Sequence, residues 1–192
     1  QGMIDDMIAK CRQATDRPAP PSLAALAPGD RITLTRALTA IESDHYTSAE
    51  LEALEAEAKN SATPVLGITG TGGAGKSSTT DEIIRRFRQD AGDTLKIAVL
   101  AIDPTRRKTG GALLGDRIRM NAINHPNIMM RSVATRDAAM EIPARLSSLI
   151  AAFKLGGFDL IIVETPGIGQ GDAGIVPYVD SSLYVMTPEF GA

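Results

Sequence analysis

The sequence predicts an α/β domain in which a doubly wound, mainly parallel sheet is flanked by helices, with an N-terminal helical linker. Three short apolar runs carry this prediction, at residues 65–69, 97–102 and 160–163. Helical patterns separate the runs, and a glycine-rich stretch joins the first run to the helix after it. Nearly continuous apolar strands joined by helices are typical of a parallel sheet buried on both faces.

The N-terminal residues 1–16 are predicted to form one amphipathic helix. Their apolar side chains recur at helical spacing, as Met3, Ile4, Met7, Ile8 and Cys11. We expect this helix to be the last helix of a preceding domain. A proline-rich segment then ends the helical pattern, with Pro18, Pro20 and Pro21.

Residues 17–61 are predicted to be a helical linker. Ser22 and Asp30 can each cap a helix, and Thr47 with Glu50 three positions later has the spacing of a capping box. The glutamates of the last helix are interpreted as a solvated face, since no metal-ligand pattern accompanies them.

From residue 62 to residue 192 strands and helices alternate. Helices are predicted at residues 77–89, 113–123 and 137–154, and a weaker fourth strand at residues 182–186.

The strongest motif is Gly70-Thr71-Gly72-Gly73-Ala74-Gly75-Lys76-Ser77, which satisfies G-x-x-x-x-G-K-[ST]. It follows a predicted strand and opens a predicted helix, as a phosphate-binding loop (P-loop) does. Glycines let successive N–H groups point inward at phosphate, and the helix N-terminus adds its positive end. Lys76 then supplies a charge for the β and γ oxygens, and Ser77 supplies a hydroxyl for Mg²⁺. The domain at residues 62–192 is therefore predicted to be a P-loop nucleoside triphosphatase.

Two acidic residues end predicted strands. Asp103 follows the second run and Glu164 ends the third, so both are expected at the carboxyl edge of the sheet, near magnesium. Gly167 lies three residues after Glu164 and can offer its N–H to the γ-phosphate. Gln170 can orient the attacking water, although a solvent contact is the simpler interpretation.

A charged stretch at residues 109–120 leaves two alternatives open. Asp116 can join the metal shell and Arg119 can reach a phosphate. Equally, the two side chains can form an i,i+3 ion pair on a solvated helix.

Composition excludes several other roles. Aromatic residues make up 4% of the chain and Trp is absent, while 20 Lys and Arg face 23 Asp and Glu. A nucleic-acid partner is therefore not expected, because neither stacking platforms nor a basic excess are present. No apolar run is long enough to span a bilayer, and one cysteine suits a reducing compartment. We expect a cytoplasmic protein with no membrane partner.

Four blocks of the second half resemble the G-protein chaperones of adenosylcobalamin-dependent acyl-CoA mutases. They are the P-loop, Asp103-Pro104-Thr105, the Thr-Gly-Gly-x-x-x-Gly-Asp-x-x-Arg-Met stretch from Thr109 to Met120, and Glu-Thr-x-Gly-x-Gly-Gln from Glu164 to Gln170. Some details depart from the stand-alone chaperones, such as Glu164-Thr165-Pro166-Gly167, and are similar to the fused members of the family. In these members a cobalamin-binding domain, the G domain and the mutase core share one polypeptide, so residues 1–16 would belong to the cobalamin domain.

The resemblance implies a site and a role. It places Ser77, Asp103, Asp116 and Glu164 around Mg²⁺. The motifs themselves make Lys76, Glu164 and Gln170 the predicted catalytic residues. Nucleotide contacts fall to Gly72, Gly73, Ala74, Gly75, Lys76, Ser77, Ser78, Arg119 and Gly167. The implied activity is GTP hydrolysis that gates adenosylcobalamin loading or release for an acyl-CoA mutase within a homodimeric, multifunctional protein.

Guanine specificity comes from the resemblance alone. The Asn-Lys-x-Asp or Asn-Lys-x-Glu motif that reads guanine is absent from these 192 residues, and we expect it beyond residue 192. Two alternatives therefore stay open. One is a P-loop ATPase or small-metabolite kinase, and the other is a module that binds nucleotide without turnover.

Overall fold

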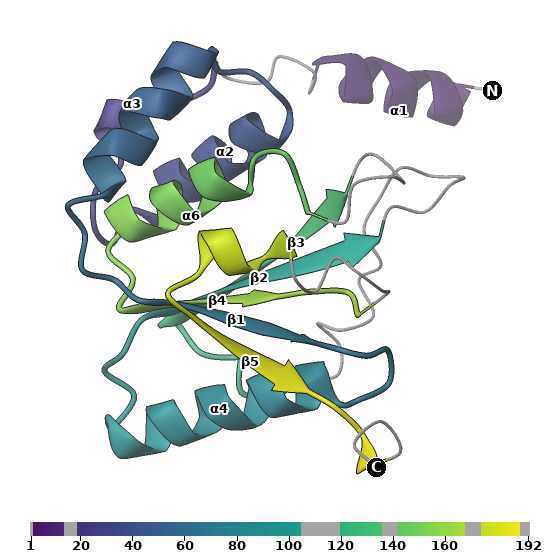
Figure 1. Ribbon diagram of the computed structural model, residues 1–192. Helices are drawn as coiled ribbons and strands as arrows, with labels where there is room; N and C mark the ends of the chain where they lie inside the picture. Colours follow the sequence, from purple (N-terminus) through teal and green to yellow (C-terminus); the bar gives the residue numbers. More distant parts are fainter. Residues whose placement is uncertain (1, 14–18, 105–119, 136–141, 168–173, 189–192) are drawn as a thin grey trace.

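A five-stranded parallel sheet forms the centre of the protein (Figure 1). The computed structural model describes residues 2–13, 19–104, 120–135, 142–167 and 174–188. The strand order is β3-β2-β4-β1-β5, and every pairing is parallel. The strands are β1 (Val65–Gly70), β2 (Ile97–Pro104), β3 (Ile128–Thr135), β4 (Leu160–Glu164) and β5 (Ser181–Val185). The predicted α/β class with a parallel sheet is confirmed.

Helices cover both faces of the sheet, as Figure 1 shows. One face carries α4 (Lys76–Asp90), and the other carries α2 (Arg31–Glu42), α3 (Ser48–Ala58) and α6 (Leu146–Leu155). Strand β2 serves both layers, since Leu100 packs with the α2, α3 and α6 side and Val99 with the α4 side. Burial of such alternating apolar side chains, at about 25 cal/mol per Å², holds the two layers on the sheet.

The N-terminal helices join the same core as the sheet. Leu34 and Leu38 of α2 and Leu51 of α3 are buried in one cluster with β2 and β4. Asp30 caps α2 through Thr33 N at 3.0 Å, and Thr47 with Glu50 forms the predicted capping box on α3. Ser22 precedes the short 3₁₀ helix η1 (Leu23–Ala25) and makes no side-chain cap bond.

Helix α1 (Gly2–Gln13) forms where the amphipathic pattern predicts it. Its side chains at Met3, Ile4 and Met7 are exposed. A second 3₁₀ helix, η2 (Val176–Tyr178), leads into β5. No helix in the described ranges is long and apolar enough to cross a membrane.

Two predicted helices were wrong in their bounds. Helix α6 begins at Leu146 rather than at residue 137, and the described residues just before it, 142–145, are not helical. Pro143 accounts for the break at residue 142, because a proline disfavours the helical conformation of the residue before it. The predicted helix at 113–123 is not helical at residues 120–123, where Ala122 N donates to Asp81 and Ala122 O accepts from Arg88.

Strand β3 was missed by the sequence analysis. Its run is interrupted by Arg131 and Ser132, so it lacks the continuous apolar pattern of a central strand. Its place at the edge of the sheet explains the polar residues. Arg131 Nε lies 2.8 Å from Glu42 Oε1, which ties this edge strand to α2.

Candidate nucleotide-binding site

The P-loop runs from the end of β1 to the start of α4, at the carboxyl edge of the sheet. Gly73 and Gly75 have φ angles of 79° and 92°, in the left-handed region that favours glycine. Thr79 N donates to Gly75 O at 2.8 Å, which opens the hydrogen-bond ladder of α4. The amides of Lys76, Ser77 and Ser78 precede that ladder, so they are the free N–H groups of a helix N-terminus, suited to an anion.

Lys76 lies under the loop it belongs to. The residue is 7% exposed, and Nζ donates to Gly70 O and Thr71 O, both at 3.0 Å. Gly167 packs directly against it, because a Cβ at Gly167 would collide with Lys76 Nζ and Gly70 O. Gly167 also has a φ of 73°, so only glycine suits both its conformation and its space. The loop after β4 therefore meets the P-loop at the lysine.

Glu164 lies between two hydroxyls of α4. Ser77 Oγ donates to its Oε1 at 2.6 Å, and Thr80 Oγ1 donates to its Oε2 at 2.8 Å. Glu164 as a residue is 5% exposed, and Thr80 is fully buried. Short bonds from two hydroxyls suit an ionised carboxylate, and they compensate its loss of water.

Asp103 lies one strand away on the same side of the sheet. Ala101 of β2 pairs with Glu164 of β4, and Asp103 follows two positions later, so it is nearer the carboxyl edge. Ala101 packs in the α4-side cluster, and alternation turns Asp103 toward the same side. Asp103 is 4% exposed.

These oxygens fit a magnesium ion that is shared with a nucleotide. In the described parts of the chain no group of three or more His, Cys, Asp or Glu side chains could hold a metal. Mg²⁺ does not need one, since it is commonly bound by one or two carboxylates together with phosphate oxygens and water. Ser77, Glu164 and Asp103 supply hard oxygen donors of this kind beside the P-loop.

The other predicted site residues divide into two groups. Gly72 and Ser78 are exposed on the P-loop and the first turn of α4, with Ala74 half-buried between them. Asp116, Arg119 and Gln170 lie outside the described residues. Sequence reasoning missed Thr80, although its i,i+3 spacing from Ser77 places both on one helix face.

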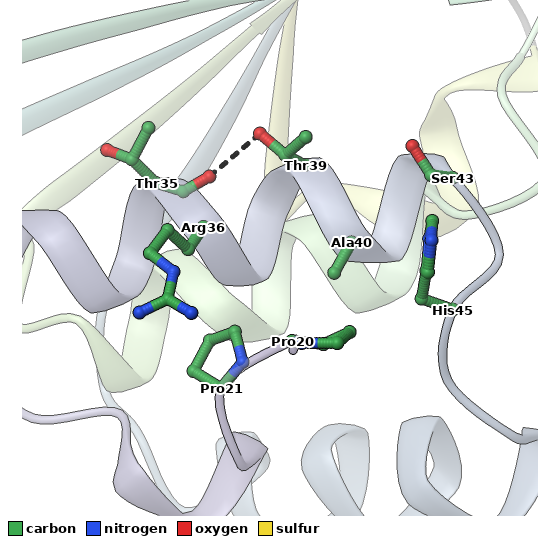
Figure 2. Close-up of a pocket in the computed structure, with 8 residues that line it drawn as sticks. All are labelled: Pro20, Pro21, Thr35, Arg36, Thr39, Ala40, Ser43 and His45. Carbon is green, nitrogen blue, oxygen red and sulfur yellow. Dashed lines mark hydrogen bonds between the residues drawn. The ribbon is translucent and has the colours of Figure 1, made fainter. Parts of the chain in front are cut away.

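A separate cavity lies on the other layer (Figure 2). It has a volume of about 360 Å³ and lies between Pro20, Pro21 and the surface of α2. Its lining is mostly apolar, and the Thr39 hydroxyl is bonded to Thr35 O. None of its lining residues belongs to the P-loop, Asp103 or Glu164, so the reactive groups lie elsewhere.

A parallel sheet, a P-loop entering α4 and an acidic residue beside its serine define a P-loop nucleotide-binding domain. The family profile of the methylmalonyl-CoA mutase-associated GTPase MeaB matches residues 34–192, and the chain belongs to this family. The family and its fold agree with the resemblance noted in the sequence.

Several known proteins are similar to this chain. The fused isobutyryl-CoA mutase of Cupriavidus metallidurans is 63% identical over 191 residues, and that of Nocardia farcinica is 53% identical over 191 residues. Both matches cover 100% of this chain but only 18% of the relative. A protein named as a GTPase from Pyrococcus abyssi is 38% identical over 164 residues, covering 85% of this chain and 49% of that protein.

A solved structure supports the same fold. It is titled a LAO/AO transport system kinase, and it matches with a TM-score of 0.60 and 30% identity. The match covers 86% of this chain and 48% of that chain.

Proposed function

We propose that this domain binds GTP with Mg²⁺ and hydrolyses it. The observation that carries the proposal is the bond between Ser77 Oγ and Glu164 Oε1, which joins the P-loop helix to the end of β4 at 2.6 Å. A buried lysine lies beside it under the loop. The nearness of the serine hydroxyl, the carboxylate and the lysine supports a site shared by a triphosphate and its cation.

The residues take distinct roles in the proposal. Ser77, Asp103, Asp116 and Glu164 would surround Mg²⁺, which supplies charge neutralisation for the phosphates. Lys76 exchanges its two carbonyl partners for β and γ oxygens.

The loop after β4 supplies the remaining groups. Gly167 offers its N–H to the γ-phosphate, and Gln170 orients the attacking water. Arg119 contacts the nucleotide.

The proposal that the nucleotide is GTP, and not ATP, rests on membership of a GTPase family. A second candidate is ATP hydrolysis, or transfer of the γ-phosphoryl group from ATP to a small metabolite with release of ADP, because the similar solved structure is titled a kinase. Both activities need the same P-loop and metal ligands, so base preference and the phosphate acceptor separate them.

We propose further that the domain serves a larger polypeptide. The whole chain aligns with a segment that makes up 18% of the length of each of two fused isobutyryl-CoA mutases. In that setting GTP hydrolysis gates the loading or release of adenosylcobalamin for a mutase core that interconverts isobutyryl-CoA and n-butyryl-CoA. Helix α1 then closes a cobalamin-binding domain, residues 17–61 link it to the G domain, and the protein is a cytoplasmic homodimer.

The test is single-turnover cleavage of GTP and of ATP by the intact polypeptide with Mg²⁺. Lys76→Ala should reduce GTP cleavage by about 100-fold or more, because the substitution removes the positive charge that stabilises the transferring phosphate. Lys59→Ala on the exposed end of α3 is the matched control and should stay within about twofold of the unsubstituted protein. Preferential ATP cleavage, or label transferred to an acceptor other than water, would move the assignment to the second candidate.

A further inference from the structure

The first turns of α4 present two hydroxyls to one carboxylate. Ser77 and Thr80 are three positions apart, so they lie on the same face of the helix, which turns toward β4. Glu164 accepts from Ser77 with Oε1 and from Thr80 with Oε2. The last torsion of a glutamate is otherwise broad, so attachment at both oxygens fixes the plane of the carboxylate.

Thr80 is suited to this task by its own surroundings. Its single hydroxyl hydrogen has two acceptors in range, Glu164 Oε2 at 2.8 Å and Lys76 O at 3.0 Å. An ionised carboxylate is the stronger acceptor, whereas the carbonyl lies where the helical ladder already uses it. Branching at Cβ restricts the χ1 angle of threonine in a helix, and the rotamer adopted here brings the hydroxyl within bonding distance of Glu164.

The side chain has no access to solvent that could replace the bond. Thr80 is 0% exposed and Glu164 is 5% exposed. Removal of the Thr80 hydroxyl would leave Oε2 buried with one fewer donor, and the carboxylate would turn to recover it. Such a turn displaces Oε1 from Ser77, the residue placed next to Mg²⁺.

We propose that Thr80 is a positioning residue of the metal site, an inference that rests on the proposed Mg²⁺–nucleotide chemistry. It acts through Glu164: by holding Oε2 it keeps Oε1 directed at Ser77 and at the cation. Ser77 and Glu164 touch the reacting assembly, and Thr80 does not. Removal of the Thr80 hydroxyl therefore lowers the affinity for the metal ion and leaves the affinity of the P-loop for the nucleotide unchanged.

The test measures metal affinity directly. Mn²⁺ replaces Mg²⁺ as a paramagnetic probe, and its binding to the intact polypeptide with saturating GDP is followed by electron paramagnetic resonance. Thr80→Val, which keeps the shape and removes the hydroxyl, should weaken Mn²⁺ binding by about tenfold, the effect of losing one charge-assisted hydrogen bond. GDP affinity without metal should stay within about twofold.

Two variants separate the hydroxyl from the fold. Thr80→Ser keeps the hydroxyl and loses the buried methyl, and should bind Mn²⁺ within about threefold of the unsubstituted protein. Thr79→Val is the matched control, because the Thr79 hydroxyl on the same helix donates to Gly75 O at 3.0 Å, whereas Glu164 accepts from Ser77 and Thr80. It should leave Mn²⁺ affinity within about twofold.

The outcomes are distinct. Unchanged Mn²⁺ affinity in Thr80→Val, or equal losses in Thr80→Ser and Thr80→Val, would overturn the inference and leave Thr80 a packing residue. If Thr80→Val does not fold, Thr80→Ala takes its place in the same comparison with Thr80→Ser. The proposed function fails by itself if the unsubstituted protein binds Mn²⁺ with GDP yet cleaves no GTP, since the affinity measurement needs no hydrolysis.

Discussion

Each face of α4 has a hydrogen-bonded glutamate beside it, one supplied by β4 and one by α4 itself, and the two glutamates differ in burial. On the inner face, Glu164 of β4 accepts hydrogen bonds at 2.6 and 2.8 Å from Ser77 and Thr80. On the outer face, Glu82 accepts bonds at 2.7 Å from both Arg85 and Arg86. Bond length does not distinguish the two carboxylates. Burial does, since Glu164 is 5% exposed whereas the side chain of Glu82 is 41% exposed.

The origin of the partners is the second difference. Glu82 bonds to residues three and four positions along its own helix, an exposed arrangement that contributes little to stability and is screened by salt. Glu164 bonds to side chains more than 80 positions away, in a place where water cannot substitute. Buried polar groups joined across elements carry both specificity and a high cost of disruption. The inner face is therefore where substitutions should affect chemistry.

The largest expected effect is on Glu164. Glu164→Gln keeps the size of the side chain and removes the negative charge that accepts from Ser77 and that, in the proposed function, would face Mg²⁺. Single-turnover GTP cleavage by the intact polypeptide should fall by about 100- to 1000-fold. Glu82→Gln applies the same chemical change to the outer face and should stay within about twofold. Equal rates for the two variants would remove the distinction between the faces.

A smaller effect, on stability, is expected at the apolar residues further along the inner face of α4. Ile84 is 0% exposed in the cluster that also contains Ile68 and Ile162. Ile84→Ala should lower the free energy of unfolding by about 2–4 kcal/mol, from lost burial and the cavity left behind. The change is read from the urea midpoint of unfolding. Phe87→Ala, at a 40% exposed position on the same helix, should cost less than half as much.

Sequence reasoning succeeded where the information is local. The P-loop, β1 and α4 follow from contiguous residues, and the capping box of α3 follows from Thr47 and Glu50. Strand β4 with Glu164 at its end follows from one apolar run. Each of these patterns is complete within a few positions, so no knowledge of the partners was needed.

It failed where partners decide the structure. Strand β3 carries Arg131, whose charge is explained only by Glu42 on a helix far away in the sequence. The four residues 120–123 look helical, but Asp81 of α4 captures the Ala122 amide. Thr80 was missed because its value depends on which face of α4 meets β4. Asp116, Arg119 and Gln170 stay predictions, since they lie outside the described residues.

The smallest expected effect is on thermal stability, from substitution of Glu82 on the outer face of α4. Hydrogen bonds from Arg85 and Arg86 lower the pKa of Glu82 from 4.5 to about 2. A lowered pKa means that the contribution to stability is present above about pH 4.5 and is lost as the pH falls toward 2. Because the pair is exposed, Glu82→Gln should shift Tm at pH 7 by less than about 2 °C.

That shift should behave as a surface interaction does. The Tm difference between Glu82→Gln and the unsubstituted protein should shrink as the pH falls from 5 to 3, and also in about 1 M NaCl, where the screening length is near 3 Å. A difference that persists at high salt would mean that Glu82 acts through more than its exposed arginine pairs. Glu164→Gln should behave differently. Its loss of GTP cleavage arises from a buried bond that salt screens little, so the loss should be the same at low salt and in about 1 M NaCl.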